Sequence, residues 1–249
     1  MSRQDFDFRR IWHYYVGHVD TLQNILFVAP VLLFSVIAHE YAHGYAALRQ
    51  GDPTALQLGR LTFNPIKHID PFLTILMPLM MGLASNWKVM LGGAKPVPVN
   101  PRNYRNFKRG DIIVSLAGVA TNLAIAIACT LLIALFGAIG GAAPSVDRAF
   151  GALQVMMIYG VFINIGLIAF NLMPIPPLDG SHVMKYLLPA RLSIWYQQVS
   201  RYGILILIAL LAFGSRVIDI WMKPAIMVTT FLLTTVDHLV LPTASALMR

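Results

Sequence analysis

The sequence predicts an all-α polytopic membrane protein. Hydrophobic residues make up 57% of the 249 residues and charged residues only 12%, with a mean hydropathy of +0.66. Soluble domains typically carry about 25% charged residues. A chain with so few charges cannot cover a water-facing surface, so lipid must cover much of it. No polar stretch is long enough for an appended soluble domain, and we therefore expect residues 1–249 to form a single domain.

The first half of the chain contains one clear membrane span. Residues 1–21 are mixed polar and aromatic, which favours an interfacial helix. Residues 22–48 are mainly apolar and would extend about 40 Å as a helix, enough to cross a bilayer. Residues 54–70 begin with alternating apolar positions and end in turn signals, which predicts short membrane-associated strands, with an amphipathic connector as the alternative. Residues 72–84 are apolar but short and interrupted by Pro78, which favours a re-entrant segment.

The second half contains two further spans and a less regular tail. Residues 112–138 and 153–173 are continuous apolar stretches of spanning length. A proline-interrupted segment follows at 171–180. Apolar stretches near 202–214 and 224–241 predict additional C-terminal helices.

Charge and cysteine content exclude several other classes of protein. The net charge of +8 in a membrane protein indicates Lys and Arg in cytoplasmic loops, and the basic residues form no stripe with interleaved aromatics, so no nucleic-acid partner is expected. Cys129 is the only cysteine, which excludes an internal disulfide and a thiolate cluster. The N-terminal residues lack the signal-peptide pattern.

The segment His39-Glu40-Tyr41-Ala42-His43 matches the metal motif H-E-x-x-H. On a helix, positions i and i+4 lie one turn apart on the same face, so two imidazoles can bind one zinc ion. Glu40 lies beside them and can accept a proton from a bound water. The alternative is coincidence, with both histidines hydrogen-bonded between helices. Glu40 is the only glutamate in the chain and the motif lies within an apolar helix, where ionisable groups are costly, so we favour the metal site.

A catalytic zinc site needs a third protein ligand. Cys129, His68 and His182 are possible, but Cys129 lies within a span and has no partner motif. Asp179 is favoured because it follows the proline-interrupted segment, and irregular backbone within a membrane is tolerated where it lines a cavity. The alternative is that Asp179 only caps the next helix.

Together, these motifs resemble the site-2 protease family of intramembrane zinc metalloproteases. The resemblance rests on His39-Glu40-x-x-His43, on Gly118-x-x-x-Asn122 and on Asn171-x-x-Pro174-x-x-x-Leu178-Asp179-Gly180, and it covers residues 22 to 190. The stretches Leu61–Pro71 and Gly93–Val99 resemble the compact bacterial members, and the chain departs from larger relatives in having no room for a PDZ or CBS domain.

The resemblance implies a zinc cofactor bound by His39, His43 and Asp179, with Glu40 as the general base. It also implies that Asn122 and Asn171 line the site and hold substrate backbone or the developing oxyanion; hydrogen bonding between helices is the alternative. Residues 22–190 would then be the catalytic core, made of three transmembrane helices around zinc, and 191–249 additional helices. The implied partners are transmembrane protein substrates and membrane lipid, and the implied location is a multi-pass position in a cell membrane, such as a bacterial plasma membrane.

Two other readings compete with this one. Prenyl-protein proteases also use H-E-x-x-H, but with a glutamate as third ligand, and Glu40 is the only glutamate here. A non-enzymatic transporter or metal carrier is the second, although no second half of the chain mirrors the first, as paired transporter repeats would.

The positions of the metal motif and of Asp179 also constrain how the chain crosses the membrane. If the metal motif and Asp179 meet, and 112–138 crosses the bilayer once between them, then residues 49 and 111 lie on the same side, which we take to be the cytoplasm. An exposed strand edge at 54–64 would hold an unwound substrate there by strand addition.

Overall fold

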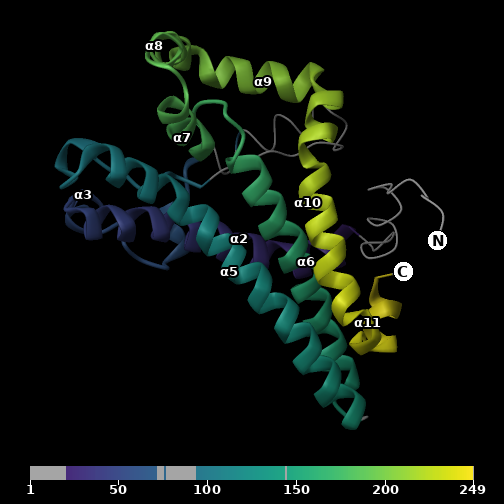
Figure 1. Cartoon of the computed structure of the whole chain (residues 1–249). Coiled ribbons are helices and arrows are strands. Elements are labelled where there is room, and N and C mark those ends of the chain that lie inside the picture. Colours follow the sequence, from purple (N-terminus) through teal and green to yellow (C-terminus); the bar gives the residue numbers. More distant parts are fainter. Residues whose placement is uncertain (1–20, 72–75, 77–93, 144, 249) are drawn as a thin grey trace. The chain divides into compact units, whose positions relative to one another are not determined.

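The computed structural model describes residues 21–71, 76, 94–143 and 145–248, and these residues are predominantly helical (Figure 1). The predicted interfacial helix at 1–21 and most of the 72–84 segment lie outside the described residues. The longer helices are α2 (Thr21–Gln50), α5 (Phe107–Ala142), α6 (Asp147–Asn171), α8 (Ala190–Val199), α9 (Gly203–Phe213) and α10 (Ser215–Val236). The shorter ones are α3 (Thr54–Gln57), η1 (Pro65–His68), η3 (Pro101–Asn103), α7 (Asp179–Leu187), η4 (Ser200–Tyr202), η5 (Asp237–Leu239) and α11 (Pro242–Leu247).

Five helical segments are long and apolar enough to cross a membrane, as judged by length and composition. Many of their large apolar side chains are exposed, including Leu131 at 66% and Phe213 at 89%, which fits a lipid-facing surface. The predicted spans at 22–48, 112–138 and 153–173 are thus confirmed as long apolar helices, and the tail adds two more. The five segments are Leu26–Gln50, Phe107–Ala142, Asp147–Asn171, Ala190–Phe213 and Ser215–Leu239.

The prediction of short strands at 54–64 is wrong. These residues form α3 and turns, and no strand occurs among the residues that the structure describes. Gly59 has a φ of +62°, a left-handed conformation that ends the α3 turn rather than extending it. Leu56 and Leu58 are both more than half exposed, so the alternating leucines do not mark a buried sheet face.

The chain forms two compact units. The first combines residues up to Leu32 with Asn122–Phe170 and Leu210–Arg249. Its core includes Ile133, Ile158 and Leu233, which are almost fully buried and come from α5, α6 and α10. The buried Gln154 donates to the carbonyl oxygens of Ile133 (2.8 Å) and Leu239 (2.9 Å) and accepts from the Leu241 N–H (2.9 Å), so one amide joins α5, α6 and η5.

The second unit contains Leu33–Thr121 and Asn171–Ala209, and it holds the residues of the metal motif. The end of α2 is joined to the start of α5, because the Arg105 N–H donates to the Gln50 carbonyl oxygen at 2.8 Å. The buried Asp52 carboxylate accepts from the Asn100 N–H (2.6 Å) and from the Asn103 side chain (2.8 Å). The two ends of the connection between α2 and α5 therefore lie next to each other.

Candidate metal centre

Two histidines of α2 form the first part of the centre. His39 and His43 lie one helical turn apart, and their Nε2 atoms are 3.0 Å from each other. His39 is buried, with 6% of its surface exposed. Both imidazoles therefore direct the same ring nitrogen to one point.

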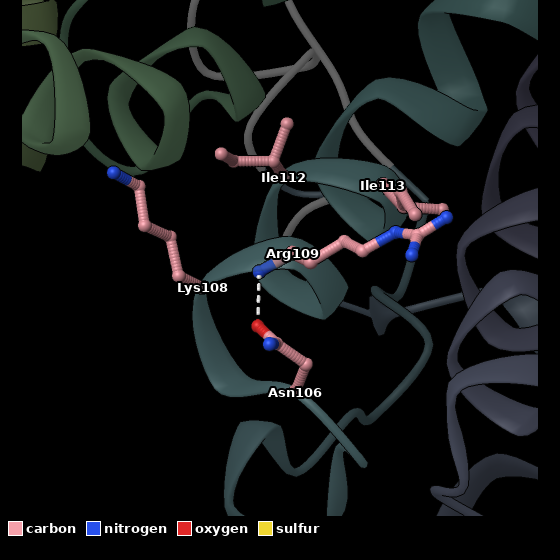
Figure 2. Close-up of a pocket in the computed structure, with 5 residues that line it drawn as sticks. All are labelled: Asn106, Lys108, Arg109, Ile112 and Ile113. Carbon is pink, nitrogen blue, oxygen red and sulfur yellow. Dashed lines mark hydrogen bonds between the residues drawn. The ribbon is translucent and has the colours of Figure 1, made fainter.

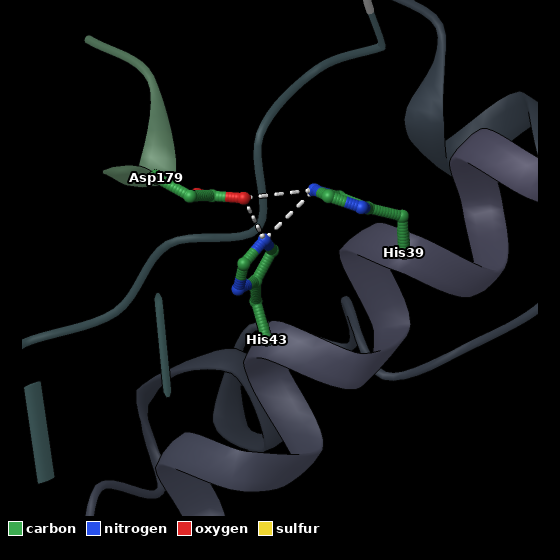
Figure 3. Close-up of side chains that lie close together, drawn as sticks. All are labelled: His39, His43 and Asp179. Carbon is green, nitrogen blue, oxygen red and sulfur yellow. Dashed lines mark hydrogen bonds and ion pairs between the residues drawn. The ribbon is translucent and has the colours of Figure 1, made fainter. Parts of the chain in front are cut away.

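Asp179, the first residue of α7, completes a group of three (Figure 3). Its Oδ2 atom lies 3.2 Å from His39 Nε2 and 3.3 Å from His43 Nε2. Zinc bonds of about 2.0–2.1 Å in a tetrahedral site place neighbouring ligand atoms about 3.3–3.4 Å apart. The three atoms therefore have the spacing and the chemistry of a two-histidine, one-carboxylate zinc site.

The protonation pattern also fits a cation at this point. The Nδ1–H of His43 donates to the Val114 carbonyl oxygen at 2.7 Å, which leaves the Nε2 lone pair of a neutral ring directed at the group. When both rings direct Nε2 lone pairs at the Asp179 carboxylate oxygen, a cation between the three atoms offsets their mutual repulsion.

A glycine of α5 makes room for His39. Any Cβ added at Gly118 would collide with the His39 ring at Cε1, Nδ1 and Nε2. The glycine thus allows the backbone of α5 to approach the imidazole directly. This contact gives a physical reason for the glycine in Gly118-x-x-x-Asn122.

Glu40 is oriented by a segment far away in the sequence. Its Oε2 atom accepts a hydrogen bond from the Val97 N–H at 2.7 Å, which leaves Oε1 as a second acceptor. Val97 is buried, and a Cβ at Gly44, one turn beyond Glu40, would meet its side chain at 2.8 Å. The residues around Val97 therefore run along α2 next to Glu40.

The other candidate ligands lie elsewhere. His68 is buried and hydrogen-bonds through Nε2 to the Thr62 carbonyl oxygen at 2.8 Å. His182 lies 3.4 Å from Asp111. Cys129 is buried in the core of the first unit. None of the three belongs to the His39–His43–Asp179 group.

The two asparagines have different surroundings. Asn122 belongs to the first unit and lies one turn after Gly118 on α5. It is fully buried, and neither atom of its amide has a hydrogen-bond partner among the described residues. Asn171 ends α6 and begins the last part of the second unit.

The sequence gives no sign of two groups that support the centre, the Val114 carbonyl and the Val97 N–H. Both are main-chain groups, so no residue type marks them. The Gly93–Val99 stretch, noted for its resemblance to compact bacterial members, was the available signal for Val97.

A separate shallow pocket lies at the start of α5 (Figure 2). Its volume is about 330 Å³, and the Asn106 side chain at its edge accepts from the Arg109 N–H at 3.0 Å. It is distinct from the metal centre because none of the three grouped side chains lines it. The lining residues are Asn106, Lys108, Arg109, Ile112 and Ile113.

Comparisons with known proteins agree with this geometry. Residues 27–214 match the family model described as Peptidase family M50. The chain is 37% identical over 186 residues to the "Putative zinc metalloprotease YwhC" of Bacillus subtilis, covering 74% of this chain and 79% of the relative. It is 29% identical over 198 residues to the "Putative zinc metalloprotease Rip2" of Mycolicibacterium smegmatis, covering 77% and 71%.

No solved structure gives a significant match. The family model covers both halves of the metal motif, from α2 to α7, and it favours proteolysis over the transporter reading. The chain belongs to peptidase family M50, the site-2 protease family of intramembrane zinc metalloproteases.

Proposed function

We propose that His39, His43 and Asp179 hold the catalytic zinc ion of this protease. The observation that carries the proposal is the convergence of their three ligand atoms within 3.0–3.3 Å of one another. Two histidines and a carboxylate leave one position of a tetrahedral site for water or substrate. His43 is held in the binding tautomer by the Val114 carbonyl, and Gly118 leaves the space that His39 occupies.

Zinc in such a site supplies Lewis-acid polarisation of the scissile carbonyl and makes water a nucleophile near neutral pH. The residues of the chain supply orientation and proton transfer. Glu40, next to His39 on α2, accepts the proton of the attacking water as the oxygen–carbon bond forms. It then delivers that proton to the leaving amine as the carbon–nitrogen bond breaks.

The hydrogen bond from Val97 prepares Glu40 for this role. It fixes one carboxylate oxygen and leaves the other for the water. A base held in place in this way loses little freedom in the transition state, which is how preorganised groups accelerate reactions.

We assign Asn122 and Asn171 to substrate contacts. The amide of Asn122 is buried and has no hydrogen-bond partner among the described residues, and it shares a face of α5 with Gly118. Buried amides need partners, and the backbone of an unwound substrate or a developing oxyanion would supply one. The assignment of Asn171 rests on the family motif in which it stands.

The chain is a multi-pass membrane protein whose family acts on membrane proteins. We propose that it cleaves within or near the transmembrane segments of its substrates in a cell membrane, such as a bacterial plasma membrane. We treat residues 1–249 as one metalloprotease domain, with 22–190 as the core and 191–249 as additional helices. Neither compact unit is contiguous in the sequence, which supports one domain over two.

The test is cleavage of a panel of transmembrane peptides by the purified protein in lipid vesicles, with zinc measured on the same samples. Wild type should contain about one zinc ion per chain and cleave at least one peptide. Glu40→Gln should keep its zinc and lose cleavage, because the amide cannot accept the proton. Substantial turnover by zinc-loaded Glu40→Gln would contradict the role of Glu40, and zinc binding unaffected by His39→Ala and His43→Ala would contradict the ligand assignment.

A further inference from the structure

A buried carboxylate on α5 holds the helix that carries Asp179. Asp111 is 3% exposed, and all of its described polar contacts outside α5 come from α7. Its Oδ2 atom lies 2.6 Å from Lys185 Nζ and accepts from the Tyr186 hydroxyl at 2.9 Å. Its Oδ1 atom lies 3.4 Å from His182 Nδ1.

The three partners lie on one face of α7. His182, Lys185 and Tyr186 stand at positions i, i+3 and i+4, which share a helix face. Asp179 stands three residues before His182, in the first turn of the same helix. The first turn of α7 thus supplies the Asp179 carboxylate next to the two histidines. The following turns contact Asp111.

Helix α7 needs such contacts with neighbouring elements because it is short. It has nine residues, whereas isolated helices of fewer than about 12–15 residues are only marginally stable in water. Its position therefore depends on contacts with its neighbours. Lys108 of α5 adds to them, with its Nζ atom 5.5 Å from the centre of the Tyr186 ring.

The same stretch of α5 supports all three members of the metal centre. Asp111 fastens the helix of Asp179, the Val114 carbonyl accepts from His43, and Gly118 leaves space for His39. These three α5 residues follow one another at i, i+3 and i+7, a spacing that keeps them on one helix face.

We propose that Asp111 is a positioning residue for the third zinc ligand: through Lys185, Tyr186 and His182 it sets the place of α7 and so brings Asp179 to His39 and His43. This inference rests on the proposed zinc site. Asp111 touches no reacting atom, and its effect on catalysis is exerted through Asp179.

The experiment measures zinc affinity of the full chain in lipid vesicles by competition with a chelator, alongside thermal stability and cleavage. Asp111→Asn should weaken zinc binding by about 10–100-fold, the usual effect of losing a group that orients a ligand. Asp111→Glu, which keeps the charge, should recover part of this loss. Lys185→Met should also weaken zinc binding, and the double variant Asp111→Asn/Lys185→Met should bind about as well as the weaker single variant, because the two act as a unit.

Asp52→Asn is the matched control. Asp52 is another buried, hydrogen-bonded aspartate of the second unit, but its partners lie outside α7. It should lower stability and leave zinc affinity unchanged. If Asp111→Asn does not fold, Tyr186→Phe removes one hydrogen bond and should give a smaller loss of zinc affinity.

The outcomes separate the two proposals. If wild type binds no zinc through His39 and His43, the proposed site is wrong. If wild type binds zinc and Asp111→Asn, or Tyr186→Phe in its place, loses only stability, the site stands and the role of Asp111 is wrong.

Discussion

At the scale of single residues, the metal motif was predictable and its supports were not. His39, Glu40 and His43 were identified because helix geometry places i and i+4 on one face, and the structure brings the two histidines together with Asp179. The place of Asp179 after the proline-interrupted segment favours it over His68 and His182 as the third ligand. Asp111 was not singled out, because an aspartate near a span end has no pattern that indicates its partners 71–75 residues away.

Gly118→Ala tests whether space for the His39 ring is essential. The added Cβ would overlap the imidazole, so the ring must shift from its place beside Asp179. We expect a loss of zinc affinity and of cleavage by about tenfold or more, as for other changes that disorient a ligand. Gly141→Ala is the control, because it lies on the same helix and an added Cβ there meets no atom within 4 Å. Equal zinc affinity in both variants would show that the contact is unimportant.

Asp179→Ala tests the third ligand directly. The variant should lose zinc and activity together, since two histidines alone make an incomplete site. His68→Ala should retain its zinc, because His68 bonds to the Thr62 carbonyl and lies outside the group of three. Zinc content per chain, measured on the purified variants, decides between them. Full zinc in Asp179→Ala together with loss in His68→Ala would reverse the assignment.

At the scale of elements, the long helices were predictable and the connections were not. The spans predicted at 22–48, 112–138 and 153–173 appear as the helices Thr21–Gln50, Phe107–Ala142 and Asp147–Asn171, so their existence was predictable and their ends were less so. The alternation of apolar residues at 54–64 predicts strands, but short helices and turns can carry the same pattern. Here Arg60 is buried and donates to the carbonyl oxygens of Lys95 (2.9 Å) and Pro96 (3.4 Å), so a side chain rather than a strand ladder joins these two segments.

The connection between α2 and α5 should open in acid. Burial alone would raise the pKa of Asp52, but hydrogen bonds from Asn100, Thr54 and Asn103 outweigh burial and hold the pKa below its ordinary value of 3.8. A lowered pKa in the folded state means that this stabilisation is present above the unfolded value and is lost as the pH falls through the folded one. We therefore expect hydrogen-exchange protection of the Asn100 amide to be constant above about pH 5 and to fall below about pH 4.

Two comparisons test whether protonation of Asp52 causes the loss of protection in acid. In Asp52→Asn, the Asn100 amide should be less protected at neutral pH and should show no further decline in acid. The Leu241 amide of wild type should keep its protection over the same range, because it donates to the neutral side chain of Gln154. An unchanged acid decline in Asp52→Asn would assign it to another group.

At the scale of the whole molecule, the main constraint is the number of crossings between α2 and α5. The hydrogen bonds from Arg105 to Gln50 and from Asn100 and Asn103 to Asp52 bring the ends of the connection together. We therefore expect both ends to lie on one side of the membrane, with an even number of crossings between them. The segment 49–111 carries nine Lys and Arg residues, which favours the cytoplasmic side. They are Arg49, Arg60, Lys67, Lys88, Lys95, Arg102, Arg105, Lys108 and Arg109.

Single-cysteine labelling in a Cys129→Ser background tests this topology with a membrane-impermeant thiol reagent. Gln57 and Arg102 are exposed positions in the connection, and Ser145 is exposed just after α5, which is long enough to cross the bilayer once. In intact cells, Gln57→Cys and Arg102→Cys should be protected and react only after the membranes are opened, whereas Ser145→Cys should react at once. The reverse pattern would place the connection outside the cell. Different accessibility of positions 57 and 102 would mean an odd number of crossings between them and would overturn this topology.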